Sequence, residues 1–183
     1  MGVVPPDQSV PRRTFEALFR PEGIPVTGAL KAELKALGVD LDALATHYPL
    51  SLLRQSMDLA RRHAFPTLSE ADGLRAVGRA FVSGFKQTPV GWVFRSMAPL
   101  FGPDRTIFTL PRYLSSVRED LPLSIVATGE RRYLLSSQEQ DARAHFLAGC
   151  LEAVLETCGA KTSFVTVATE SADGFTIELG WSE

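Results

Sequence analysis

Residues 163–181 read SFVTVATESADGFTIELGW, and this stretch decides the fold class. Over 175–181, large apolar side chains alternate with smaller or polar ones, which is the period of a half-buried β-strand. We expect a second strand over 163–169, because Ser171-Ala172-Asp173-Gly174 has the composition of a turn. The end of the chain is therefore predicted to form an antiparallel strand pair.

A further strand pair and a helix precede this stretch. Residues 123–127 and 132–136 have strand-like composition and flank a turn that contains Gly129. Residues 141–157 carry apolar side chains at helical spacing, and Gly159 is expected to end that helix. The C-terminal part of the chain is thus predicted to have the order strand–strand–helix–strand–strand.

The preceding part of the chain is predicted to be helical. Residues 1–13 are rich in proline and polar side chains, and we expect them to form an extended lead-in. Helix start signals then recur before apolar residues spaced three and four apart. The expected helices begin near Phe15, at Thr27, at Tyr48-Pro49, at Ser69, at Thr88-Pro89 and at Asp104, and Pro111 is expected to bend or break the last.

Helices and strands are therefore segregated along the chain. This segregation indicates an α+β fold, in which an N-terminal helical half packs on a C-terminal antiparallel sheet with ββαββ order. No internal repeat and no long linker divides the sequence, so we expect residues 1–183 to form a single domain.

Glycine and aromatic residues mark one part of the helical half. Gly78 lies inside the helix that begins at Ser69, where a glycine costs up to about 1 kcal/mol relative to alanine. We interpret it as a point of close helix contact. The spacing of the nearby aromatic residues is most simply that of a core, but an apolar pocket is the alternative. The candidate ligand-pocket residues are Phe81, Phe85, Trp92 and Phe94.

Composition and charge argue against several classes of protein. Nineteen Lys and Arg against 21 Asp and Glu leave a formal net charge of −2, so nothing favours nucleic acid or an anionic membrane. No apolar run reaches the roughly 18 residues that span a bilayer, and we expect no direct membrane insertion. Two cysteines are too few for a disulfide framework, so we expect a reduced, cytoplasmic protein.

The sequence contains no recognisable catalytic or metal-binding motif. Gly-x-Ser-x-Gly, Cys-x-x-Cys and His-Glu-x-x-His are all absent, and the three histidines share no spacing. Cys150 and Cys158 are expected to be buried structural thiols. We predict no catalytic residue and no metal site. The alternative is an enzyme whose site is assembled from distant residues, such as His145 with carboxylates.

Several short motifs recur in an order that resembles a known family. They include Leu37-Gly38-Val39-Asp40-Leu41, Tyr48-Pro49, Thr88-Pro89-Val90-Gly91, Gly102-Pro103-Asp104-Arg105, Phe146-Leu147-Ala148-Gly149 and the terminal Trp181. Together they resemble the uncharacterised paralogous family expanded in myxobacteria, a domain of unknown function of about this length. The resemblance covers nearly the whole chain and implies no established activity.

The helices-then-sheet order is also similar, more distantly, to the haem nitric-oxide-binding, 4-vinyl-reductase and TRAPP group of domains. This similarity implies a ligand-binding or protein-docking module, in some members with an apolar tunnel between helices and sheet. The haem members supply a proximal histidine and a downstream Tyr-x-Ser-x-Arg motif. Residues 95–120 contain no histidine and no such motif, so haem is disfavoured and no cofactor is predicted. Tyr113-Leu114-Ser115-Ser116 also lacks the asparagine common there in the myxobacterial family.

Two function classes follow from these features. The leading hypothesis is a non-enzymatic sensory or regulatory module that binds a small apolar ligand or docks a protein partner, because an aromatic-rich helical half occurs without a catalytic motif. A homodimer is one form that such docking would take. The rival is the enzyme with a site assembled from distant residues. A cavity lined by paired titratable groups would favour the enzyme.

Overall fold

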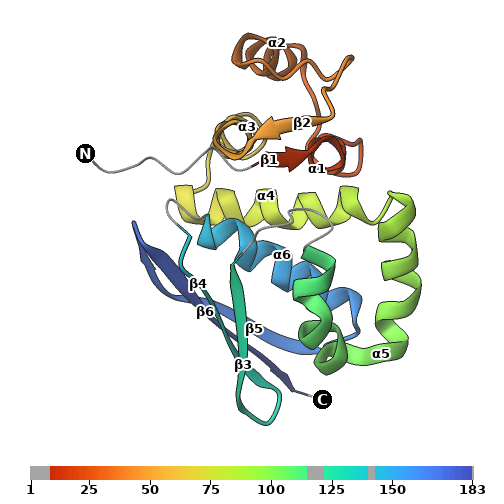
Figure 1. The fold of residues 1–183 in the computed structure, drawn as a ribbon, viewed down its shortest axis with the longest axis vertical. Helices are drawn as coiled ribbons and strands as arrows, with labels where there is room; N and C mark the ends of the chain where they lie inside the picture. The colour runs from red at the N-terminus through yellow and green to blue at the C-terminus, as the bar shows by residue number, and fades with distance from the viewer. Residues whose placement is uncertain (1–8, 115–121, 140–142, 183) are drawn as a thin grey trace.

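A computed structural model describes residues 9–114, 122–139 and 143–182 and confirms the α+β fold with ββαββ order (Figure 1). The elements, in chain order, are β1 (Ser9–Pro11), α1 (Arg12–Leu18), α2 (Gly28–Leu37), β2 (His47–Pro49), α3 (Leu50–Ala64), α4 (Glu70–Phe85), α5 (Pro89–Leu114), β3 (Leu123–Gly129), β4 (Arg132–Ser137), α6 (Ala144–Thr157), β5 (Thr162–Ser171) and β6 (Gly174–Ser182).

The main sheet is antiparallel with the strand order β3-β4-β6-β5. Strand β6 is central, because Leu179 pairs with Tyr133 of β4 on one side and with Val165 of β5 on the other. The alternation expected for this strand is present: Phe175, Ile177 and Leu179 are buried. Their side chains form the core between the sheet and the helices.

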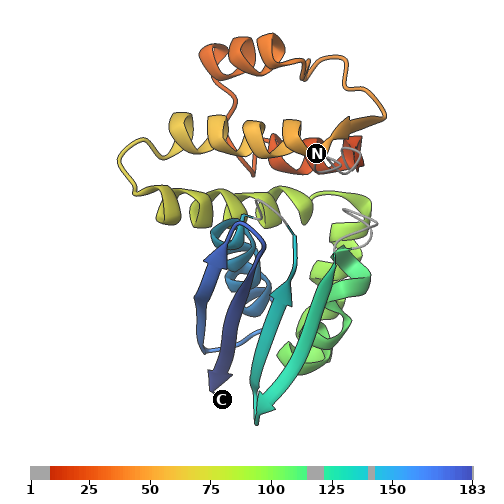
Figure 2. The same ribbon diagram turned by 60° about the vertical axis from the view of Figure 1, so that its left-hand side comes forward.

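The helices form layers above one face of the sheet (Figure 2). Helix α6 lies next to the sheet, α4 packs on α6, and α1 and α3 pack on the other side of α4. Helix α5 runs down the side of the molecule toward β3. None of the described helices is long and apolar enough to cross a bilayer.

Local capping explains where helices α2 and α4 begin and where α2 ends. The Thr27 hydroxyl accepts a hydrogen bond from the Leu30 N–H at 3.2 Å, and the Ser69 hydroxyl accepts one from the Asp72 N–H at 3.1 Å. Each satisfies an N–H that the first helical turn leaves without a backbone partner. Helix α2 ends at Gly38, whose φ of 104° suits glycine.

The structure differs from expectation at two places. Residues 1–8 of the expected extended lead-in lie outside the described residues; Ser9–Pro11 are extended but pair with β2, with Val10 opposite Tyr48, and α1 already begins at Arg12. The second difference is in α5, which continues past Pro111 to Leu114, so the expected break there is wrong. The interruption expected just before Asp104 is present: the chain turns at Gly102, whose φ of 73° is costly for residues with a side chain.

Helices α4 and α6 touch backbone to backbone. A Cβ atom at Gly78 would overlap the carbonyl oxygen of Phe146, and one at Gly149 would overlap that of Arg75. The interpretation of Gly78 as a close helix contact is therefore confirmed. Beside the crossing, the Arg79 guanidinium donates to Glu156 at 2.8 Å, which raises the pKa of Arg79. This crossing fixes the position of the two helices that form much of the candidate site.

Candidate functional site

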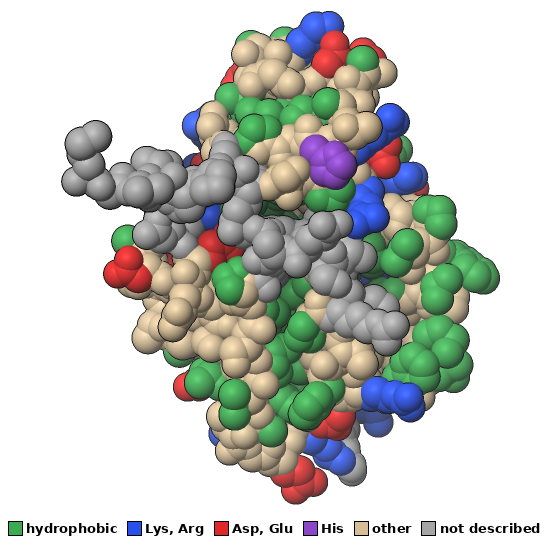
Figure 3. Space-filling view, in the orientation of Figure 1, with side chains coloured by type: hydrophobic (Ala, Val, Ile, Leu, Met, Phe, Trp, Pro, Cys, Tyr) green, Lys and Arg blue, Asp and Glu red, His purple; other side chains and the backbone are tan. Residues whose placement is uncertain are grey.

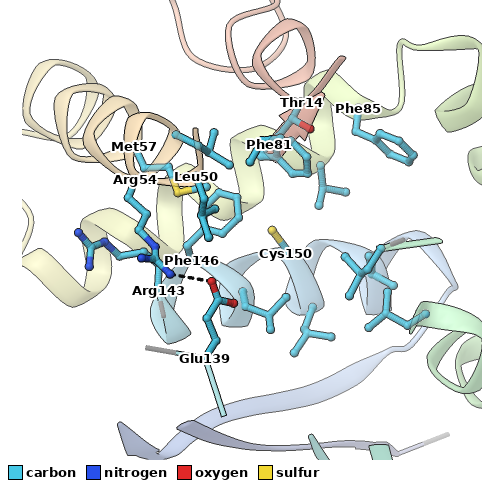
Figure 4. Close-up of a pocket in the computed structure, with 18 of the residues that line it drawn as sticks. Thr14, Leu50, Arg54, Met57, Phe81, Phe85, Glu139, Arg143, Phe146 and Cys150 are labelled. Carbon is cyan, nitrogen blue, oxygen red and sulfur yellow. Dashed lines mark hydrogen bonds and ion pairs between the residues drawn. The ribbon is translucent and has the colours of Figure 1, made fainter. Parts of the chain in front are cut away.

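An apolar cavity of about 160 Å³ lies where α3, α4, α5 and α6 meet (Figure 4). Most of its lining is hydrocarbon or aromatic, and the N-terminal segment and β6 complete it. The lining residues are Val10, Thr14, Leu50, Leu53, Arg54, Met57, Phe81, Val82, Phe85, Phe94, Leu110, Leu114, Glu139, Arg143, Phe146, Leu147, Cys150, Leu151, Val154 and Phe175.

A chain of phenylalanine rings links the elements around the cavity. The ring centroid of Phe81 is 5.6 Å from that of Phe146 on α6 and 6.4 Å from that of Phe85. The Phe85 ring is in turn 6.4 Å from Phe94 on α5. These separations are typical of favourable aromatic pairs. The rings therefore define the relative positions of α4, α5 and α6 around the space that they enclose.

Of the four candidate pocket residues, the structure brings three together. Phe81, Phe85 and Phe94 line the cavity, whereas the Trp92 side chain is 58% exposed and does not line it. The reason is helix geometry. Trp92 precedes Phe94 by two residues, about 200° around the helix axis, so the two side chains point to different faces of α5.

One end of the cavity carries charged side chains that are already paired. Arg54 on α3 donates from Nη2 to Glu139 Oε1 at 2.7 Å, with side chains 19% and 10% exposed. Arg143 donates from Nη2 to Asp58 Oδ2 at 3.1 Å. The other polar atoms of this second pair, Arg143 Nε and Asp58 Oδ1, are buried without a partner among the described residues. Both pairs join α3 to the segment between β4 and α6.

Two sulfur atoms also lie at the cavity. Met57 lines it from α3, and Cys150 lines it from α6 (Figure 4). The Cys150 thiol donates to the Gly78 carbonyl oxygen at 3.4 Å, and burial raises its pKa, so the group is a neutral thiol. Cys158 is also buried, and burial raises its pKa too. Both free cysteines are therefore the buried thiols that the sequence predicts.

The histidines lie away from the cavity. His145 Nε2 is 3.5 Å from Glu170 Oε2, and His63 Nε2 is 2.9 Å from Glu33 Oε1. Glu170 also accepts from the Ala144 N–H at 3.2 Å, so it caps α6. Within residues 9–114, 122–139 and 143–182, no cluster of three or more His, Cys, Asp or Glu is placed to hold a metal ion.

Sequence reasoning missed several lining residues because they come from separate parts of the chain. Phe146 and Cys150 belong to the inward stripe of the predicted 141–157 helix, which was a usable signal for their burial. Nothing in the sequence pairs Arg54 with Glu139, because 85 residues separate them. In the segment Tyr113-Leu114-Ser115-Ser116, Leu114 lines the cavity. Ser115, Ser116 and the Tyr113 side chain lie outside the described residues.

A family model described as "protein of unknown function (DUF2378)" matches residues 8–182. The chain belongs to this family. The match spans almost the whole sequence, so the DUF2378 family includes both the helical half and the sheet. No curated protein matches the sequence. The expected resemblance to a family of unknown function is thus confirmed, and the family itself assigns no activity.

Solved structures show which fold the DUF2378 chain shares. An H-NOX protein variant of K. algicida with unliganded Fe(II) aligns with a TM-score of 0.60 at 11% identity, over 85% of this chain and 88% of that one. An S. oneidensis H-NOX protein in the Fe(II)NO state aligns with a TM-score of 0.58 at 15% identity, over 85% and 89%. At these identities the likeness shows the fold alone. The expected relation to the haem nitric-oxide-binding fold is confirmed.

This comparison corrects the expectation about cofactors. The sequence predicted no cofactor and disfavoured haem, yet the similar structures include one whose description concerns haem redox potential and porphyrin distortion. That structure aligns with a TM-score of 0.56 at 12% identity, over 83% of this chain and 88% of that one. The motif argument from residues 95–120 was misleading, because a fold is kept after individual motifs have diverged. The absence of the motif therefore does not argue against haem.

The described residues match a haem group only in part. Of the side chains that ligate haem iron in proteins, Met57 and Cys150 line the cavity, and the histidines do not. An engineered cavity of about 150 Å³ holds benzene, so a porphyrin requires this 160 Å³ cavity to widen.

Proposed function

We propose that this protein is a non-enzymatic sensory module that binds a small apolar ligand in the cavity between α3, α4, α5 and α6. The observation that carries the proposal is the cavity itself, which five phenylalanines line and which several separate elements enclose. Ligand sites are concave and mostly apolar, with few polar groups. Two free, buried cysteines are compatible with action in the reducing cytoplasm.

The arrangement of the cavity supports a regulatory role. Its walls come from elements far apart in the sequence, so an occupant contacts the helical half and the ββαββ half together. A ligand that binds one arrangement of these elements more tightly than another shifts the population toward it. The charged pairs Arg54–Glu139 and Arg143–Asp58 also cross this junction, so they report on the same rearrangement.

The enzyme alternative has less support from the geometry. The pair of titratable groups expected for it, His145 with a carboxylate, is present as His145 and Glu170, but neither residue lines the cavity. Asp141, the carboxylate four residues before His145 in the sequence, lies outside the described residues. Burial keeps the Cys150 thiol neutral, which makes it a poor nucleophile.

A thermal-shift screen of the full chain tests the proposal. Ligand at 100 times its dissociation constant stabilises a protein by about 2.7 kcal/mol, which for a chain of this size raises Tm by roughly 5–10 °C. The screen contains single-ring hydrocarbons, fatty alcohols, fatty acids and hemin, and native mass spectrometry of freshly purified protein identifies any species already bound. A screen in which no compound raises Tm would contradict the proposal.

Docking to a second copy of the chain is a second candidate function, favoured by the outer face of α5. Trp92, Val93 and Leu100 are 58%, 54% and 76% exposed there, and hydrophobic side chains gather on this side of the molecule (Figure 3). Ser96 between them is uncharged, and its hydroxyl donates to the Trp92 carbonyl oxygen at 2.9 Å. A two-fold contact brings identical faces together, so an uncharged face suits self-association.

Light scattering tests the docking candidate. We expect a dimer that Trp92→Ser and Leu100→Ser convert to a monomer. Leu68→Ser is the matched control, because Leu68 is also an exposed leucine at 42% but lies between α3 and α4. A wild-type monomer at micromolar concentration would rule this candidate out and would leave the ligand proposal unaffected.

A further inference from the structure

We infer that the ligand of the cavity is a neutral, compact hydrophobe with about the size of a single aromatic ring. The inference rests on the proposed function and narrows it, because it names the chemical class that the cavity accepts. Three features of the structure carry it: the volume of the cavity, the pairing of its polar groups, and the identity of the side chains in its wall.

Volume sets the size of the occupant. The cavity measures about 160 Å³. An engineered cavity of about 150 Å³ with a lining of Leu, Ile and Phe stays dry and binds benzene. The occupant that fills this space without moving its walls therefore has roughly six to ten non-hydrogen atoms. Long acyl chains and porphyrins exceed that size.

The pairing of the polar side chains sets the charge of the occupant. Arg54 and Glu139 neutralise each other at 2.7 Å, and Arg143 is paired with Asp58 at 3.1 Å. Arg143 lines the cavity and Asp58 does not, but the Asp58 carboxylate already balances the charge of the Arg143 guanidinium, so Arg143 Nε offers a ligand a hydrogen-bond donor and no net charge.

The Cys150 thiol already donates to the Gly78 carbonyl oxygen, so it adds no free donor. A charged ligand would lose its hydration without gaining a counter-ion, or it would have to separate a largely buried ion pair. A neutral ligand avoids both costs.

The wall itself favours a ring. The Phe81 and Phe146 rings are tilted by 57°, and the Phe85 and Phe94 rings by 54°, so both ring edges and ring faces are available. Aromatic rings prefer offset or edge-to-face contacts with one another. Met57 and Cys150 add two polarisable sulfur atoms to the wall, and sulfur contacts with aromatic rings are favourable.

Titration calorimetry of the full chain at pH 7 with three single-ring probes tests the inference. The probes are toluene, which is neutral, benzoate, which is anionic, and benzylammonium, which is cationic. We expect toluene to bind and both charged probes to bind at least about 100-fold more weakly, since neither finds an unpaired group of opposite charge. Neutral 1-dodecanol and hemin are added to test size.

Two cysteine variants show whether toluene occupies this cavity. Cys150→Met extends a side chain into the space, and we expect it to weaken toluene binding at least tenfold. Cys158→Met is the matched control, because Cys158 is also buried but does not line the cavity, and its toluene affinity should equal that of the wild type. Should Cys150→Met fail to fold, Val154→Leu fills the same space by a single methylene group, and we expect it to weaken toluene binding severalfold.

The outcomes separate this inference from the proposed function. If benzoate, dodecanol or hemin binds more tightly than toluene and Cys150→Met weakens that binding, the ligand class is wrong but the sensory cavity stands. Toluene binding that Cys150→Met and Val154→Leu leave unchanged would place the ligand elsewhere and overturn the inference. If none of the five probes binds, both the inference and the proposed function fail.

Discussion

Helices α4 and α6 meet in two different ways within a few residues of each other. At Gly78 and Gly149 their backbones touch, and there is no room for even a methyl group. Next to this crossing, Phe81 on α4 and Phe146 and Cys150 on α6 line a cavity of about 160 Å³. The comparison shows that side-chain volume at a few positions decides whether two helices close against each other or leave space for a ligand.

Breaking the close contact should have the largest effect. Gly149→Ala places a Cβ atom where the Arg75 carbonyl oxygen lies, and the helices must move apart to admit it. We expect the free energy of unfolding to fall by about 3 kcal/mol, as for overpacked cores, measured by urea denaturation. Gly28→Ala is the control, because nothing lies within 4 Å of its added Cβ. Equal losses of unfolding free energy in the two variants would contradict the backbone contact between α4 and α6 at Gly149.

The ion pair at the cavity end should have the next largest effect. Glu139→Gln removes the charge that Arg54 faces at 2.7 Å, in a pair whose side chains are at most 19% exposed. We expect a loss of about 2 kcal/mol of unfolding free energy, because the remaining guanidinium stays largely buried. The exposed pair Lys31–Asp42 is the comparison, and Asp42→Asn should cost less than about 0.5 kcal/mol. If the Glu139→Gln and Asp42→Asn proteins are equally stable, the Arg54–Glu139 ion pair does not stabilise the contact between α3 and the segment that joins β4 to α6.

The hydrogen bond between Tyr133 on β4 and Asp104 on α5 should have a smaller effect on stability, and this effect depends on pH. Burial first, and then the hydrogen bond to Asp104 at 2.7 Å, raise the pKa of Tyr133 to about 12. Since the folded state resists loss of this proton, stability is full below the ordinary pKa of about 10 and falls as the pH rises toward 12. We expect a slope of about 1 kcal/mol per pH unit in that window, and Tyr133→Phe should remove it. If the same pH dependence persists in Tyr133→Phe, another titrating group causes it.

The smallest effect on stability belongs to the outer face of α5. Trp92→Ala should change the free energy of unfolding by less than about 0.5 kcal/mol, because Trp92 is 58% exposed. Phe94→Ala, two residues further on, should cost about 3 kcal/mol, because Phe94 is 4% exposed. Denaturation of both variants at one protein concentration makes the comparison. Similar losses would mean that Trp92 is covered in solution, as docking requires.

The sequence predicted most of the fold because local signals and packing agree. The alternation over 175–181, the cap at Thr27 and the glycine at position 38 each act over a few residues, and each appears where expected. The pairing of β1 with β2 was missed, because it joins Val10 to Tyr48 across 38 residues without a local pattern. Pro111 was misjudged, because proline removes one helical hydrogen bond without necessarily ending a helix.

The candidate site was less predictable than the fold. Spacing along a helix identified Phe81, Phe85 and Phe94 as inward side chains, whereas Trp92 was included only because it lies in the same helix as Phe94, and it points to the other face of α5. The volume of the cavity and the Arg54–Glu139 pair arise from contacts between distant segments, which no single stretch of sequence encodes. The order of helices and strands already resembled the haem nitric-oxide-binding group, and the structural comparison confirmed this fold at only 10–15% identity.

Crystallography under xenon pressure tests the central claim, a preformed apolar cavity, most directly. Xenon binds in dry apolar cavities of this size. The account predicts a xenon site among Phe81, Phe146 and Cys150 in the wild-type protein, and its loss in Cys150→Met. Xenon absent from this place in the wild type, with side chains or water filling the space, would contradict the account.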